Sequence, residues 1–251
     1  MSARSAKTKE ESLESYLYAS DKARMKVLVV QMTDFARQAF LSAVKALNSL
    51  DMETARSVMA NDDAIDDLEE QIDQECLYSI AMRQPMREDL RFVYAVMKII
   101  TDIERIGDQA VNISGRLLKY VEITGGKSPV PKLEQIQEMG DRCDAMLADF
   151  LESFDKEDSS ILERMRENRH CVAEIGDEAV SLLIQRLASP YLIETPMEIF
   201  CAIWIIRHIG RVADHLMNLA EKVYFIGTGI SPMTLKRRTP EDQRELPVAE
   251  V

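Results

Sequence analysis

Apolar side chains recur at intervals of three and four positions along most of this 251-residue chain. The pattern becomes regular from Asp21 onward, and its first members are Met25, Leu28, Met32, Phe35 and Ala39. This spacing gathers apolar groups on one face of an α-helix, whereas a half-buried strand would alternate every second residue. The chain is therefore predicted to be all-α.

Turn and stop signals divide this pattern into six long helices. The turn at 48–51 separates the first two, and Asp51 is expected to cap the second, which extends to about residue 83. Gln84-Pro85 separates it from the third, which Gly125-Gly126 ends. The last three are expected at about 132–154, from about 159 to 188, and from 196 to about 227. Thr195 and Glu198 predict a capping box at the start of the last helix.

The two halves of the chain repeat each other. The segment IIRHIGRVADHLMNLAE at 205–221 matches IITDIERIGDQAVNISG at 99–115. We therefore predict two tandem three-helix bundles, at 21–126 and 127–230. A flexible segment at 1–20 and a polar tail at 231–251 are expected to flank them.

Two pairs of carboxylates are predicted to meet between the second and third helices. Glu104 and Asp108 project from the same stripe as apolar residues of the third helix, while Lys98, Arg105 and Gln109 lie on the opposite side. Asp66 and Glu104 lie equally far along the chain from Pro85, on opposite sides of it. Asp62 and Asp108 are also equally far from Pro85. Two antiparallel helices would thus bring all four acids to one height.

Four acids so close would repel one another unless a cation neutralised them. Their hard oxygen atoms suit Mg²⁺, Ca²⁺, Mn²⁺ or iron. A cation site at Asp62, Asp66, Glu104 and Asp108 is the favoured interpretation. The alternative is that these acids line a solvated groove or pair with neighbouring Arg and Lys.

Composition narrows the class of protein further. The net charge of −12 argues against general affinity for nucleic acid. The four cysteines are widely spaced, which favours buried free thiols in a reducing compartment. No apolar run approaches the length of a membrane span and no signal peptide opens the chain, so a cytoplasmic protein without membrane insertion is expected. Trp204 is expected in the core.

The segment RQPMREDLRFVYAVMKIITDIERIGDQAVNI at 83–113 resembles the signature of the PhoU family of phosphate-signalling regulators, and GRVADHLMNLAEKVYFIGTG at 210–229 resembles its second repeat. The resemblance implies tandem three-helix bundles that bind divalent or trivalent metal ions (iron, Mg, Mn or Zn) through paired acidic motifs. It also implies a non-enzymatic role: a homodimer that restrains phosphate uptake and starvation signalling. Its implied partners are the ATPase subunit of a phosphate ABC transporter and a sensor histidine kinase.

The second repeat departs from the family pattern. Gly210 stands where a glutamate is usual, so Asp214 lacks its acidic neighbour. Sequence similarity sets Asp177 at the position of Asp62, whereas counting from the loop sets Glu174 opposite Gly210 and His170 opposite Asp214. Asp214 and Glu174 are the candidate ligands of a weaker second site.

Two other classes of function stay open at this point. One is a carboxylate-bridged metalloenzyme, an oxidase or a phosphohydrolase. The absence of the Glu-x-x-His motif of di-iron bundles argues against the oxidase. The other is a purely structural helical oligomer.

Overall fold

Every regular element in the computed structural model is a helix, within the residues that it describes (2–189, 194–231 and 234; side chains from residue 17). The helices are α1 Ser2–Ser49, α2 Met52–Ala60, α3 Asp63–Arg83, α4 Glu88–Thr124, α5 Leu133–Lys156, α6 Ile161–Leu187 and α7 Pro196–Thr228. The all-α prediction is confirmed. No helix in this part of the chain combines the length and the apolar character that crossing a membrane requires.

Two predicted helix boundaries differ from those observed. The helix expected from 51 to 83 is divided into α2 and α3 by a turn at Asn61 and Asp62, two residue types with low helix propensity. Helix α1 begins at Ser2 rather than Asp21. Residues 2–20 contain neither Gly nor Pro, so nothing in that segment stops a helix. Most of the predicted polar tail lies outside the described residues.

The predicted helix caps are confirmed. The Asp51 carboxylate accepts hydrogen bonds from the backbone N–H groups of Glu53 and Thr54. Gly125 ends α4 with a left-handed φ of 63°. Thr195 and Glu198 form a capping box at the start of α7. These caps satisfy backbone groups that a helix end would otherwise leave without partners.

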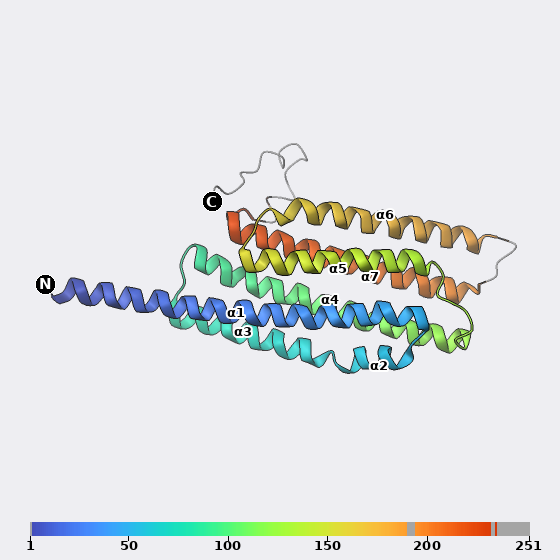
Figure 1. Ribbon diagram of the computed structural model, residues 1–251, viewed down its shortest axis with the longest axis horizontal. Coiled ribbons are helices and arrows are strands. Elements are labelled where there is room, and N and C mark those ends of the chain that lie inside the picture. The colour runs from blue at the N-terminus through green and yellow to red at the C-terminus, as the bar shows by residue number, and fades with distance from the viewer. Residues whose placement is uncertain (1, 190–193, 232–233, 235–251) are drawn as a thin grey trace.

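Helices α4 and α7 lie side by side at the centre of the molecule and run antiparallel (Figure 1). At one end Arg91 Nε donates a hydrogen bond to the Ile226 carbonyl at 3.0 Å. Farther along, His215 Nδ1 lies 2.9 Å from Asp102 Oδ1. Helices α1, α2 and α3 pack on one side of this pair, α5 and α6 pack on the other, and α1 also contacts α5.

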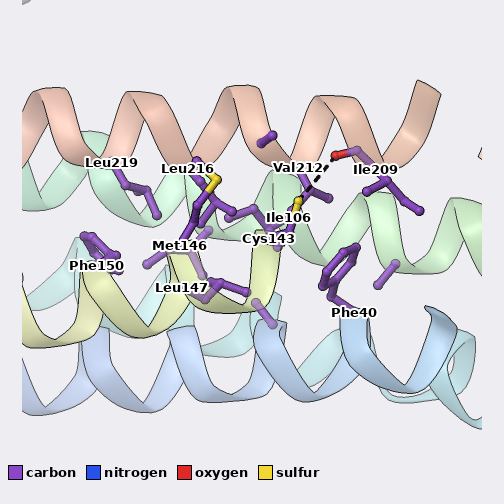
Figure 2. Packing of buried hydrophobic residues seen from close by; sticks show 14 of the residues in the cluster. Phe40, Ile106, Cys143, Met146, Leu147, Phe150, Ile209, Val212, Leu216 and Leu219 are labelled. Atoms are coloured by element: carbon purple, nitrogen blue, oxygen red, sulfur yellow. Dashed lines mark hydrogen bonds between the residues drawn. The ribbon is translucent and has the colours of Figure 1, made fainter. Parts of the chain in front are cut away.

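The core is continuous between the two halves (Figure 2). Apolar side chains from α1, α4, α5 and α7 point toward one another there; the labelled ones are Phe40, Ile106, Cys143, Met146, Leu147, Phe150, Ile209, Val212, Leu216 and Leu219. The Cys143 thiol donates a weak hydrogen bond to the Ile209 carbonyl at 3.9 Å. Burial of this apolar surface stabilises the repeats as a pair.

Two expectations about single side chains are wrong. Trp204 is 42% exposed, and its ring stacks on His208 with 5.9 Å between ring centroids. The Arg116 guanidinium lies over the same indole, 5.0 Å from the centroid. Gln109, expected at the surface, is buried because α7 covers that side of α4.

Candidate metal centre

The start of α3 lies against the middle of α4, and Gly107 allows this close approach. A Cβ atom at Gly107 would come within 2.7 Å of Ile65 Cδ1 and 3.5 Å of Asp62 Oδ1. The break between α2 and α3 places Asp62 at the N-cap position of α3. Asp62 therefore lies beside the segment of α4 that carries Glu104 and Asp108.

The predicted ligands lie at the solvent edge of the α3–α4 contact rather than inside the bundle. Asp62, Glu104 and Asp108 are half-buried, whereas Asp66 is exposed. The buried side of α3 is formed by Ile65, Leu68, Ile72, Cys76 and Ser79. The division of the helix explains the difference, because the face of α3 cannot be extrapolated across it from α2.

The acids nevertheless influence one another electrostatically. Burial raises the pKa of Glu104 to about 7, with Asp108 as the next cause and smaller contributions from Glu69 and Asp66. Burial also raises the pKa of Asp62, followed by the charges of Asp66 and Asp108. Both helices thus contribute to one region of negative potential. Glu69 belongs to this region although it was not among the predicted ligands; its position one turn after Asp66 was the available signal.

Arg105 is the base that partly neutralises this region. Its Nη1 donates to Asp108 Oδ2 at 2.8 Å, and its Nε lies 3.3 Å from Glu104 Oε2. The Arg105 side chain is 54% exposed, so the ion pair is screened by solvent. Glu104 Oε2 is buried and has no hydrogen-bond partner.

The chemistry of these donors fits a hard cation. Glu104 and Asp108 share one arginine beside the acids of α3, and a buried carboxylate oxygen without a hydrogen bond has unused capacity to coordinate. Among the described side chains of residues 17–189 and 194–231, however, no group of three or more His, Cys, Asp or Glu converges closely enough to hold a metal ion. Coordination would require these side chains to move together.

The predicted ligands of the second repeat are engaged separately. Arg169 of α6 donates through Nε and Nη2 to Asp214 Oδ1 of α7, at 2.9 and 2.8 Å. Glu174 is 67% exposed at its side chain and lies 3.2 Å from His170 Nδ1. Arg169 was not predicted here, although counting from the loop had set its neighbour His170 opposite Asp214. An arginine at this position already neutralises the acid that a cation would need.

A known protein domain matches each of the two repeats. The family model described as "PhoU domain" matches residues 29–117 and 136–223. A relative from Pseudomonas putida is 32% identical over 206 residues, which cover 80% of this chain and 77% of the relative. A second, from Pseudomonas aeruginosa, is 31% identical over 79% of this chain and 81% of its own length. Both are named phosphate-specific transport system accessory protein PhoU homolog.

Two solved structures share the fold. The crystal structure of PhoU from Pseudomonas aeruginosa superposes with a TM-score of 0.77 at 27% identity, and covers 85% of this chain and all of its own. The phosphate transport system regulatory protein PhoU from Streptococcus pneumoniae gives a TM-score of 0.76 at 24% identity, over 85% of this chain and 98% of its own. The second likeness supports the fold alone.

Proposed function

Because the chain belongs to the PhoU family, with one matched domain in each repeat, we propose that it is a cytoplasmic regulatory adaptor of phosphate transport. In this proposal it contacts the ATPase subunit of a phosphate ABC transporter and a sensor histidine kinase, and it restrains both uptake and starvation signalling. The observation that carries the proposal is the family match across both repeats. The names of the relatives, which describe accessory proteins rather than enzymes, support it.

A surface suited to partner binding lies around the α3–α4 turn. Large apolar side chains are exposed along the end of α3 and the start of α4: Leu77, Tyr78, Met82, Met86, Leu90 and Tyr94. Met86 is the most exposed, at 75%. Exposed apolar groups of this kind are typical of protein interaction sites, and flexible Met side chains adapt to a partner. We call these six residues the turn surface.

A pull-down tests the adaptor role. Tagged protein would be incubated with the purified ATPase subunit and, separately, with the cytoplasmic part of the kinase, at high and low phosphate. Capture of either partner at micromolar concentration supports the proposal. If neither partner is retained at either phosphate level, the adaptor role is wrong.

A matched pair of variants tests the turn surface itself. Met82→Ser with Met86→Ser should weaken capture at least tenfold, since it removes two exposed apolar groups. Met59→Ser changes an exposed methionine on α2, toward the opposite end of the molecule from the α3–α4 turn (Figure 1), and should leave capture unchanged. Equal loss in both variants would assign the contact to another surface.

We further propose that the first repeat binds a metal ion through Asp62, Glu104 and Asp108, with Asp66 as a peripheral ligand. The excess of acids over bases in this region and the buried Glu104 Oε2, which accepts no hydrogen bond, support this. When bound, the cation supplies positive charge that holds α3 against α4. It would thus stabilise the contact between the start of α3 and the middle of α4.

Elemental analysis together with thermal unfolding tests the metal. Wild-type protein reconstituted with Mn²⁺, Mg²⁺, Zn²⁺ or iron should retain metal after desalting and unfold at a higher temperature. Glu104→Gln with Asp108→Asn should lose both effects. Glu134→Gln with Asp141→Asn makes the same charge change at exposed positions of α5 and should keep them. Equal metal content in both double variants would overturn the site.

Two finer expectations belong to the same proposal. The adaptor is expected to act as a homodimer, which light scattering on the purified protein would test directly. The metal is expected to be concentrated in the first repeat, since Arg169 and His170 already engage Asp214 and Glu174.

A further inference from the structure

A groove of about 320 Å³ between α6 and α7 occupies the second repeat at the level of Asp214. Its polar lining includes three arginines, Arg169, Arg207 and Arg211, together with Asp177 and Asp214. Three arginines and two aspartates therefore line one concave site. The balance is cationic, in a chain whose net charge is −12.

The repeat itself shows where this positive charge comes from. Thr101, Glu104 and Arg105 of α4 align with Arg207, Gly210 and Arg211 of α7. The first set holds one acid and one base, whereas the second holds two bases and no acid. At the position where the first repeat offers cations a carboxylate, the second therefore offers an excess of guanidinium.

The arginines of this groove are not equally available. Arg169 is held by Asp214 through two hydrogen bonds. Arg207 and Arg211 lie one helical turn apart on α7 and are both exposed; neither forms an ion pair within 4.0 Å among the residues that the structure describes. Side chains four residues apart on a helix are neighbours, so one ligand can engage both.

Space for a ligand exists beside this arginine pair. A Cβ atom added at Gly210 would meet no other atom within 4 Å. The missing glutamate thus leaves open volume on the groove side of α7, between the two free arginines. A guanidinium offers several N–H donors in a planar fork that matches the oxygens of a phosphate.

We propose that this groove binds a phosphate group, or a tetrahedral oxyanion of like charge, between Arg207 and Arg211. Arg169 lines the same groove and exchanges between Asp214 and the anion. The second repeat has then kept the helical frame of the first and reversed the charge of the ligand that it accepts. This site does not depend on the metal or on the adaptor role.

Titration calorimetry at constant ionic strength tests the site, with inorganic phosphate as the probe and chloride and sulfate as comparators. Saturable binding of phosphate, shared by sulfate but not by chloride, supports a site for tetrahedral oxyanions. An absence of saturable phosphate binding to the wild type, or equal binding of chloride, would overturn it.

Three variants assign the binding to the groove. Arg207→Gln with Arg211→Gln should weaken phosphate binding at least tenfold. Gly210→Glu should also weaken it at least tenfold, because it places at this position the carboxylate that the first repeat has in Glu104. The matched control is Arg164→Gln on α6, since Arg164 is half-exposed and pairs with Asp149 outside the groove. Circular dichroism and the unfolding temperature show that each variant is folded. Binding that survives in the folded double variant would refute the assignment.

A second arm distinguishes the source of the phosphate group. Adenosine monophosphate is titrated in place of inorganic phosphate. Tighter binding of the nucleotide assigns the groove to a phosphate ester, and tighter binding of the free ion assigns it to inorganic phosphate. In either case the arginine pair is the anchor, and the double variant should lose both ligands.

Discussion

His208 Nδ1 lies 2.9 Å from Gln109 Oε1 inside the contact between α7 and α4. Its counterpart is the contact of His215 with Asp102. The sequence repeat aligns Asp102 with His208 and Gln109 with His215. Each contact therefore joins one of these aligned positions in one repeat to the other position in the second repeat. The α4–α7 interface is thus pseudo-symmetric in position, with both histidines on α7 and both of their partners on α4.

The buried imidazole of His208 predicts a specific pH dependence of stability. Its Nε2 is buried without a hydrogen-bond partner. Burial, followed by the charges of Arg211 and Arg116, lowers the pKa of His208 to about 4. The unfolded chain therefore binds this proton near pH 6.5 while the folded chain does not. The free energy of unfolding should therefore keep its full value above that pH. It should fall by about 2–3 kcal/mol as the pH drops toward 4.

Urea denaturation at pH 7, 5.5 and 4.5 measures this effect as a difference between variants. His208→Gln keeps a polar partner for Gln109 and removes the titrating group, so it should flatten this part of the profile. The exposed His170→Gln should follow the wild type. Identical profiles for the wild type and His208→Gln would contradict the assignment.

Asp102 is expected to stabilise the join between the repeats. Its Oδ1 accepts from Asn218 Nδ2 at 3.0 Å and contacts His215 Nδ1. Asp102→Ala leaves both groups without that acceptor and should lower the free energy of unfolding by about 1–3 kcal/mol. Asp102→Asn retains one acceptor and should lose less. Asp141→Ala, at an exposed position, should change stability by no more than about 0.5 kcal/mol in the same denaturation series.

Gly107 should be sensitive to any added side chain. In Gly107→Ala the new methyl group would lie 2.7 Å from Ile65 Cδ1, and such overpacking costs about 1–3 kcal/mol. Ile65→Val removes that carbon, so the double variant should be more stable than the two separate effects predict. Gly115→Ala is the control on the same helix: its Cβ meets nothing within 4 Å, and it should be neutral or stabilising by up to about 1 kcal/mol. Strictly additive effects of Gly107→Ala and Ile65→Val would show that the two groups do not touch.

Thiol labelling should separate the four cysteines by exposure. Cys76, Cys143 and Cys201 are buried, and Cys171 is half-buried. Burial also raises the pKa of Cys143, which lowers its thiolate content further. In native protein one thiol per chain should react rapidly with a chromogenic disulfide, and all four should react in denaturant. Cys171→Ser should abolish the rapid phase; its persistence would assign that phase to another cysteine.

Most of the helices, and the helix ends that carry a cap, could be predicted because their causes are local. Asp51, Gly125 and the Thr195–Glu198 box act within one turn of the backbone. The repeat can likewise be recognised because the residues at 99–115 align with those at 205–221. None of these features depends on how distant segments pack.

The sequence by itself therefore determined the helical class, the caps, the repeat and the family resemblance. Tertiary packing decided which sides of the helices are covered. Gln109 was expected at the surface with Lys98, yet α7 packs over it while Lys98 stays exposed. Asp66 was expected on a buried face, but the break at Asn61 and Asp62 separates α3 from α2 and leaves Asp66 exposed. Arg169 meets Asp214 across the α6–α7 contact. Helical periodicity describes one helix at a time, whereas burial and ion pairing depend on the neighbours that cover each side.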